Sequence, residues 1–210
     1  MENNPAPTGR NLINKATFRR NFRNKHKNQT YLCYEVEVWK DGKWTKVKKY
    51  QGFRRKLTYK EPRHKESCWL VDNNGRRRGP YAELSFLDLF QSWNLDRGRQ
   101  YRLTWYMSWS PYPDCAQKLV EFLGENSHVT LRIFAADIHS LCSGYEDGLR
   151  KLRDARAQLA IMTRDELQYC WVTFVDNQGQ PFRPWPNLVE HIKTKKQELK
   201  DILGSESSGE

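Results

Sequence analysis

The 210-residue sequence has no run of about 18 apolar residues, so a helix that crosses a membrane is not expected. Its first ten residues, MENNPAPTGR, lack the apolar segment of a secretory signal. The five cysteines are odd in number and scattered along the chain, which argues against a disulfide framework and for a reducing compartment. These absences together predict a cytoplasmic protein with no membrane partner.

Acidic residues are scarce in the first part of the chain. Residues 1–79 contain 21 Lys and Arg against 7 Asp and Glu, a net charge of +14, whereas residues 80–210 contain 15 against 18, a net charge of −3. The positive charge is densest over 19–27, 46–56 and 75–79, with aromatic residues in between. A solvated surface would explain charge alone, but basic clusters that alternate with stacking platforms favour nucleic acid as the partner.

The composition is that of a folded domain. Hydrophobic residues make up 38% of the chain and include eight tryptophans, enough to bury a sizeable core. We expect a flexible N-terminus over 1–11, a single domain over 12–203 and a disordered polar tail over 204–210.

Helical and strand-like segments alternate along the predicted domain. A capping-box pattern joins Thr163 to Glu166, so a helix is expected to begin there. Apolar spacing predicts the other helices over 12–22, 82–93, 116–123, 144–156 and 187–203. Strands are expected on either side of an Asp41-Gly42 turn within 30–50, and over 101–109, 129–136 and 157–162. The segment 54–80 is expected to be a long loop, and the alternation predicts an α/β fold.

Two short segments have the frame of a metal site. Zinc-dependent nucleobase deaminases carry the signature H-x-E followed by P-C-x-x-C, in which one His and two Cys hold zinc and the Glu transfers protons. Here the frame reads YAE at 81–83 and PYPDC at 111–115. Glu83 is therefore present, whereas Tyr81 and Tyr112 occupy two of the three ligand positions.

Six segments resemble one family in order and in spacing. They are TYLCYEVE, AELSFLDLF, SWSPYPDC, VTLRIFAA, IMTRDELQYCWVTFVD and PFRPWPNL. The sequence resembles the APOBEC/AID polynucleotide cytidine deaminases over about 12–203, above all the branch that restricts retroviruses. The resemblance implies a cytidine-deaminase fold, with a five-stranded mixed sheet flanked by about six helices. It also implies cytosine-to-uracil editing of single-stranded DNA, often together with RNA binding.

The resemblance assigns a role to each residue of the frame. Tyr81 stands at the histidine ligand, Tyr112 and Cys115 stand at the two cysteine ligands, and Glu83 stands at the acid/base. A phenol has a pKa near 10, and zinc prefers imidazole and thiolate. We therefore expect the two rings to fill the cavity, no zinc cofactor to bind, and Glu83 to be a vestigial acid/base.

A buried glutamate under two rings needs a polar partner. We expect Glu83 to accept a hydrogen bond from a tyrosine hydroxyl or a backbone N–H, or else to have a raised pKa. His64 and Cys68, in the adjoining loop, offer an alternative pair of metal ligands.

A second group of residues is expected to contact nucleic acid, because of positive charge or because of its position in the family pattern. It comprises Arg19, Arg20, Arg23, Lys25, His26, Lys27, Thr30, Arg54, Arg55, Lys56, Trp109, Ser110 and His139. Lys56 stands where the family has an asparagine, and Asp137 and His139 stand where it has an arginine and a tyrosine. An Asp at that place is expected to repel a phosphate backbone. For Trp109, a role as a core aromatic residue is equally open.

The sequence therefore predicts a catalytically inactive deaminase-like domain. It would bind RNA or single-stranded DNA through its basic surface and act in antiviral restriction, or in its regulation, without editing. One alternative is an active single-stranded DNA cytidine deaminase with an unusual metal site. Another is a protein-interaction module that assembles with itself, with a catalytic homologue or with a viral antagonist.

Overall fold

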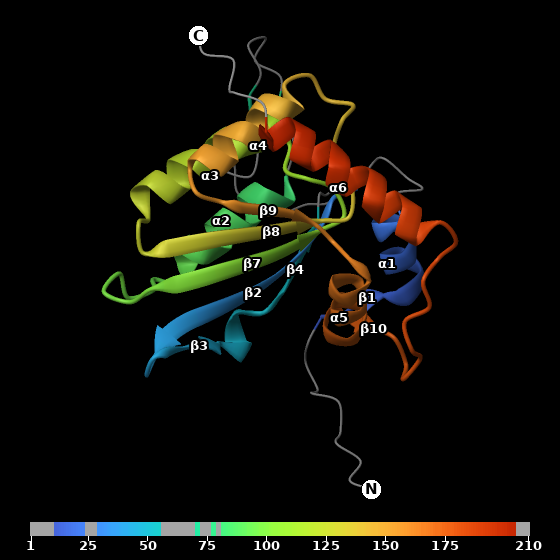
Figure 1. The fold of residues 1–210 in the computed structure, drawn as a ribbon. Helices are drawn as coiled ribbons and strands as arrows, with labels where there is room; N and C mark the ends of the chain where they lie inside the picture. The colour runs from blue at the N-terminus through green and yellow to red at the C-terminus, as the bar shows by residue number, and fades with distance from the viewer. Residues whose placement is uncertain (1–10, 24–28, 56–69, 72–76, 79–80, 205–210) are drawn as a thin grey trace, which may run out of the picture.

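A mixed β-sheet forms the centre of the molecule. The computed structural model describes residues 11–23, 29–55, 70–71, 77–78 and 81–204 (Figure 1). The strand order is β3-β2-β7-β8-β9. β2 (Tyr31–Lys40) is antiparallel to β7 (Tyr101–Met107), whereas β7, β8 (Val129–Ala135) and β9 (Gln158–Ile161) are parallel.

One edge of the sheet is made of two short strands. β3 (Lys43–Lys46) pairs with the end of β2, and β4 (Gly52–Arg55) pairs with its beginning. A 3-10 turn over Lys48–Tyr50 separates the two. Because β3 and β4 share one edge position, the expected five-stranded sheet is confirmed. The expected Asp41-Gly42 hairpin turn is also confirmed, with φ of 51° and 75° at its two residues.

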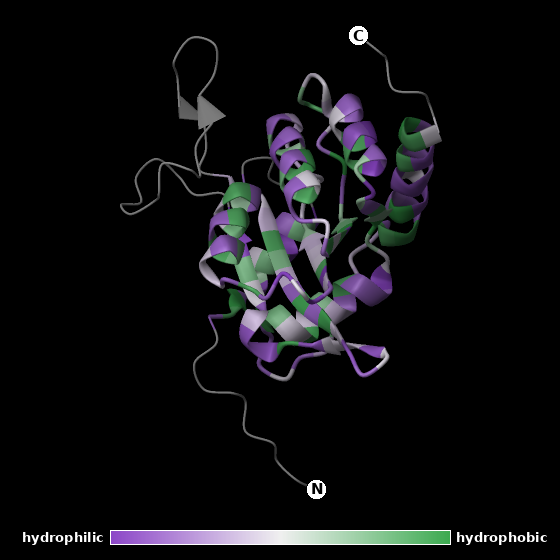
Figure 2. Cartoon of the chain, turned by 90° about the vertical axis from the view of Figure 1, so that its left-hand side faces the viewer, coloured by the Kyte–Doolittle hydropathy of each residue, from purple (hydrophilic) through white to green (hydrophobic). Residues whose placement is uncertain are grey.

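In the described parts of the chain, six helices cover the two faces of the sheet, as expected. They are α1 (Lys15–Phe22), α2 (Ala82–Ser92), α3 (Pro113–Glu125), α4 (Tyr145–Asp154), α5 (Arg164–Phe174) and α6 (Leu188–Gly204). Side chains alternate along each strand, so Leu103 and Trp105 pack in a core with α2, α3 and α4. Cys33 and Tyr106 point to the other face, where α1 and α5 pack. Figure 2 shows the resulting pattern: hydrophobic colour follows the strands, and both colours alternate along the helices.

Several predicted boundaries differ from the observed ones. The helix expected over 12–22 begins only at Lys15, because Ile13–Asn14 form β1, which pairs in parallel with β10 (Val175–Asp176). The side chain of Asn14 then accepts a hydrogen bond from the backbone N–H of Ala16 at 2.9 Å and so caps the helix.

A local signal located the start of α5 correctly. The capping box of Thr163 and Glu166 is present at the start of α5. The helix expected over 116–123 starts earlier, at Pro113, since proline is favoured in the first turn.

Within the loop expected over 54–80, β5 (Leu70–Val71) pairs with β6 (Arg77–Arg78). No helix within the described parts of the chain is long and apolar enough to cross a membrane.

Gly52 lies too close to the Tyr34 ring to accept a side chain. A Cβ atom at Gly52 would lie 2.8 Å from the Tyr34 hydroxyl oxygen. The Tyr34 ring is buried against Phe86 and Trp93, so it has little room to move. We expect Gly52→Ala to lower the free energy of unfolding by about 1–3 kcal/mol, as measured by urea denaturation.

Gly124, in α3, provides the matched control. A Cβ there meets nothing within 4 Å. Gly124→Ala should therefore leave stability unchanged or raise it by up to about 1 kcal/mol, because alanine is the better helix former. Equal stabilities for the two variants would contradict the close approach at Gly52.

Candidate deaminase-like site

The beginnings of α2 and α3 bring the motif residues together. Tyr81 precedes α2 and Tyr112 precedes α3, each with extended backbone. Their rings lie 5.0 Å apart between centroids, at 37°. Tyr81 is 3% exposed and Cys115, in the first turn of α3, is fully buried. The two rings and this thiol form one cluster with Leu84, as the motif spacing predicted.

Glu83 connects the two helices. It lies in the first turn of α2 and is 2% exposed. Its Oε1 atom accepts a hydrogen bond from the backbone N–H of Tyr112, at 3.1 Å. An acceptor at this place satisfies a donor at the start of α3, where the helix dipole favours negative charge. The expected backbone hydrogen bond to Glu83 is therefore confirmed.

The donor atoms around Glu83 do not suit zinc. Burial, and then the neighbouring Tyr112 and Cys115, raise the pKa of Tyr81 well above that of an ordinary phenol. A buried phenol that keeps its proton is a poor ligand for an ion that prefers imidazole and thiolate. Across the described ranges, no group of three His, Cys, Asp or Glu residues is arranged to hold a metal ion. The alternative ligands His64 and Cys68 lie outside those ranges.

His139 contacts Tyr112 and also links it to Trp109 and Ser110, two further residues expected to contact nucleic acid. The His139 ring lies 5.2 Å from the Tyr112 ring and 5.4 Å from the Trp109 ring, edge to face with both. The Oγ atom of Ser110 accepts a hydrogen bond from the His139 backbone N–H at 2.9 Å. The structure thus places Trp109, Ser110 and His139 beside the tyrosine pair.

Asp137 is directed away from this site. Its carboxylate is largely buried and lies 3.0 Å from the Lys195 ammonium and 3.7 Å from the His191 ring, both on α6. The expected repulsion of a phosphate backbone is not supported, because the negative charge is compensated within the fold. No local pattern indicated this pairing, since the partner residues are more than 50 positions downstream.

β4 places two arginines that are expected to contact nucleic acid beside the start of β2, which is hydrogen-bonded to the segment before Trp109. Arg55 pairs with Tyr31 and Arg54 pairs with Leu32 across β4 and β2. Tyr31 also binds Ser108, the residue before Trp109: its carbonyl accepts the Ser108 N–H at 2.9 Å, and its own N–H donates to Ser108 Oγ at 3.0 Å. Thr30, which directly precedes β2, is half-buried.

The arginines of α1 form a separate group. This helix packs against α5 on the opposite face of the sheet from α2, through Phe18 and Trp171. Arg19 donates a hydrogen bond to the Arg183 carbonyl at 3.1 Å, while Arg20 and Arg23 are exposed. Four other residues expected to bind nucleic acid, Lys25, His26, Lys27 and Lys56, lie outside the described ranges.

One polar contact in this region was missed from the sequence. Cys142 was not among the residues singled out from the sequence, but its Sγ atom lies 2.9 Å from Nδ1 of His139. The sequence feature that could have indicated this contact is that the two residues lie three positions apart.

The chain has the cytidine-deaminase fold. It has a mixed sheet with helices on both faces, and Glu83 and Cys115 lie at the starts of two adjacent helices. The sequence model of the family described as "APOBEC3, cytosine deaminase domain" matches residues 11–203. The chain therefore belongs to the APOBEC3 family, and the membership and restriction-factor branch inferred from the motifs are confirmed.

Several relatives with similar sequences are named "DNA dC->dU-editing enzyme APOBEC-3G". The protein from Papio anubis is 41% identical over 203 residues, which is 95% of this chain and 50% of the relative. The protein from Chlorocebus aethiops is 41% identical over 197 residues, covering 92% and 49%. The protein from Lagothrix lagotricha is 37% identical over 208 residues, covering 95% and 50%. The chain thus spans about half the length of these curated relatives.

Proposed function

We propose that this chain is a deaminase-like domain that has lost zinc-dependent catalysis and binds single-stranded nucleic acid. The observation that carries the proposal is the packing of Tyr81 against Tyr112, with ring centroids 5.0 Å apart, at the two positions where the family has a zinc-binding imidazole and thiolate. The buried Tyr81 ring and the partly buried Tyr112 ring would occupy the space of a metal-bound water, and the Tyr81 phenol, whose pKa is raised by burial, replaces a ligand that zinc prefers.

Two observations support nucleic acid as the ligand. Residues 1–79 carry a net charge of +14, and neutralising phosphates with Lys and Arg drives binding of this class. The relatives are named as DNA-editing enzymes.

We propose that a single domain over 12–203, between tails over 1–11 and 204–210, binds RNA or single-stranded DNA in the cytoplasm. Any antiviral effect would then come from occupancy of nucleic acid rather than from editing.

Charge reversal at Arg54 and Arg55 of β4, together with the Lys56 that follows in the sequence, tests the proposed binding surface. In the variant Arg54→Glu, Arg55→Glu, Lys56→Glu, affinity for single-stranded DNA should fall for every sequence tested. Each lost phosphate contact should reduce the slope of log affinity against log salt by about 0.7. Fluorescence anisotropy at several salt concentrations measures both quantities.

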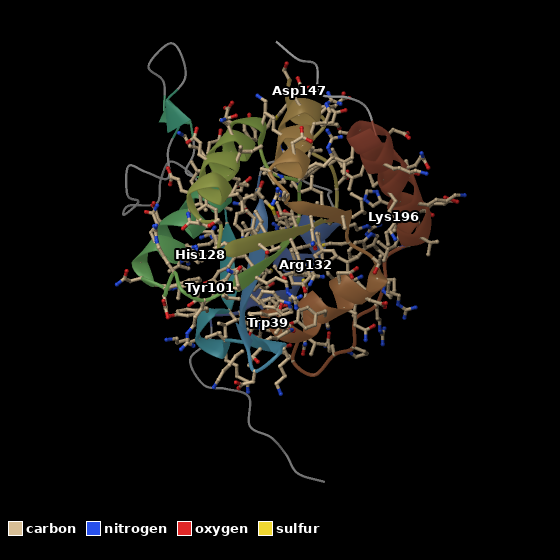
Figure 3. The ribbon with its side chains drawn as sticks, turned by 60° about the vertical axis from the view of Figure 1, so that its left-hand side comes forward. Trp39, Tyr101, His128, Arg132, Asp147 and Lys196 are labelled. Atoms are coloured by element: carbon tan, nitrogen blue, oxygen red, sulfur yellow. The ribbon has the colours of Figure 1, made fainter. Side chains whose placement is uncertain are left out.

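The matched control reverses the same number of charges on α6. Lys193, Lys196 and Lys200 are exposed there, and Figure 3 shows Lys196 on this helix. Lys193→Glu, Lys196→Glu, Lys200→Glu should lower affinity less and keep the slope of the unmodified chain. An equal loss in both variants would mean that only net charge matters and would overturn the β4 surface.

The retained Glu83 makes residual deamination the main alternative. An active enzyme would form uracil in single-stranded DNA, and the product would disappear in Glu83→Ala. If the chain binds no nucleic acid at any salt concentration, a protein-interaction role remains, with another copy, a catalytic homologue or a viral antagonist as the partner.

A further inference from the structure

The loop between β8 and α4 contains a paired thiol and imidazole. Sγ of Cys142 lies 2.9 Å from Nδ1 of His139. Cys142 is half-buried, whereas the three other cysteines within the described ranges, Cys33, Cys115 and Cys170, are buried. Among the four, Cys142 is therefore the thiol that a reagent can reach.

The imidazole of this pair is held from several sides. Ser110 Oγ accepts the backbone N–H of His139 at 2.9 Å, and the edge-to-face contacts with Trp109 and Tyr112 limit rotation of the ring. A base within hydrogen-bond reach of a thiol, and oriented by further groups, is the arrangement that activates a cysteine nucleophile.

A cavity adjoins the thiol. It has a volume of about 240 Å³, and its lining includes Cys142, Ser143 and the first turn of α4. Its exposed charges are carboxylates, since the side chains of Glu146 and Asp147 are 47% and 51% exposed. Arg150, which also lines the cavity, is only 8% exposed and pairs with both carboxylates, at 2.6 Å from Asp147 and 3.5 Å from Glu146, so the three groups together carry one net negative charge. The cavity therefore suits a small reagent that carries positive rather than negative charge.

We propose that Cys142 is a modification site for low-molecular-weight disulfides, with cationic disulfides preferred and His139 as the base. In the step, Cys142 Sγ attacks one sulfur of the disulfide while Nδ1 of His139 accepts the thiol proton. The disulfide bond breaks, and the departing thiolate takes up a proton. Cys142 is oxidised to a mixed disulfide, and the reagent is reduced to one free thiol.

The proposed modification requires neither zinc nor nucleic acid, although it shares His139 with the expected nucleic-acid contacts, so it goes beyond the function proposed above. If the contact between His139 and Cys142 only satisfies the polar atoms of the loop, the thiol will react no faster than its exposure allows. The two cases predict opposite effects of folding on the reaction rate of Cys142. Burial alone lowers the rate of a thiol, whereas an oriented base raises it.

The first experiment uses the unmodified, fully reduced chain. It is treated with cystamine at pH 7, either folded or in urea, and adduct formation at Cys142 is followed by peptide mass mapping. We expect Cys142 to react about tenfold faster in the folded chain, because an unassisted thiol reacts through a thiolate fraction of only a few per cent. A folded rate equal to or below the unfolded rate would overturn the proposal.

Two variants and a second reagent complete the test. His139→Gln should lose the acceleration, and Cys142→Ser should form no adduct in this peptide. Folding should also increase the preference for cystamine over glutathione disulfide several-fold; an unchanged preference would refute the role of the cavity carboxylates.

Discussion

The double variant Tyr81→His, Tyr112→Cys is expected to retain one zinc ion per chain, whereas the unmodified protein is expected to retain none. The change supplies an imidazole and a thiolate next to Cys115, which is already buried in the first turn of α3. One His and two Cys at the starts of two adjacent helices form the ligand set that leaves an open position on zinc. Elemental analysis of protein purified without chelator measures the zinc content.

The control for this prediction is Tyr81→Phe, Tyr112→Phe, which keeps both rings and removes both hydroxyls. It should bind no zinc. When Glu83→Ala is added to the variant Tyr81→His, Tyr112→Cys, any uracil formation that this variant has acquired should be abolished, because Glu83 occupies the acid/base position.

Zinc at one ion per unmodified chain would contradict the proposed function and make tyrosine ligation or a rebuilt site the working hypothesis. Absence of zinc from the double variant would show that the rings are not what prevents binding.

Phe86→Ala is expected to lower the free energy of unfolding by about 3–5 kcal/mol. The Phe86 side chain is fully buried, and its ring centroid lies 4.9 Å from those of both Tyr34 and Trp105, edge to face. Its removal would leave a cavity between α2 and the sheet and break several aromatic contacts at once. Urea denaturation measures the change.

The control for this second prediction is Val189→Ala on α6. Val189 is 81% exposed, so the change should alter the free energy of unfolding by no more than about 0.5 kcal/mol.

The zinc prediction and the Phe86 prediction are related, because we expect a core of this kind to stabilise the domain without a metal. A chelator should therefore leave the melting temperature of the unmodified chain unchanged. A small effect of Phe86→Ala together with unfolding by chelator would show that the fold depends on a metal ion instead.

Features encoded within a few residues could be predicted from the sequence. The Asp41-Gly42 turn and the Thr163 capping box depend on neighbours two or three positions apart, and both are present in the structure. Spacing within the motif likewise placed Glu83 and Cys115 at the beginnings of two helices. The fold class and the juxtaposition of the tyrosine pair therefore followed from local patterns and from the family resemblance.

Contacts between distant residues were decided by the tertiary structure alone. The pairing of Ile13 with Val175, which shortens α1, joins segments more than 150 positions apart. The bonding of Asp137 to Lys195 turns an expected repulsive charge into an internal ion pair. Neither could be inferred from spacing, because a strand or carboxylate has many candidate partners along the chain, and only the packing of the sheet and helices selects one.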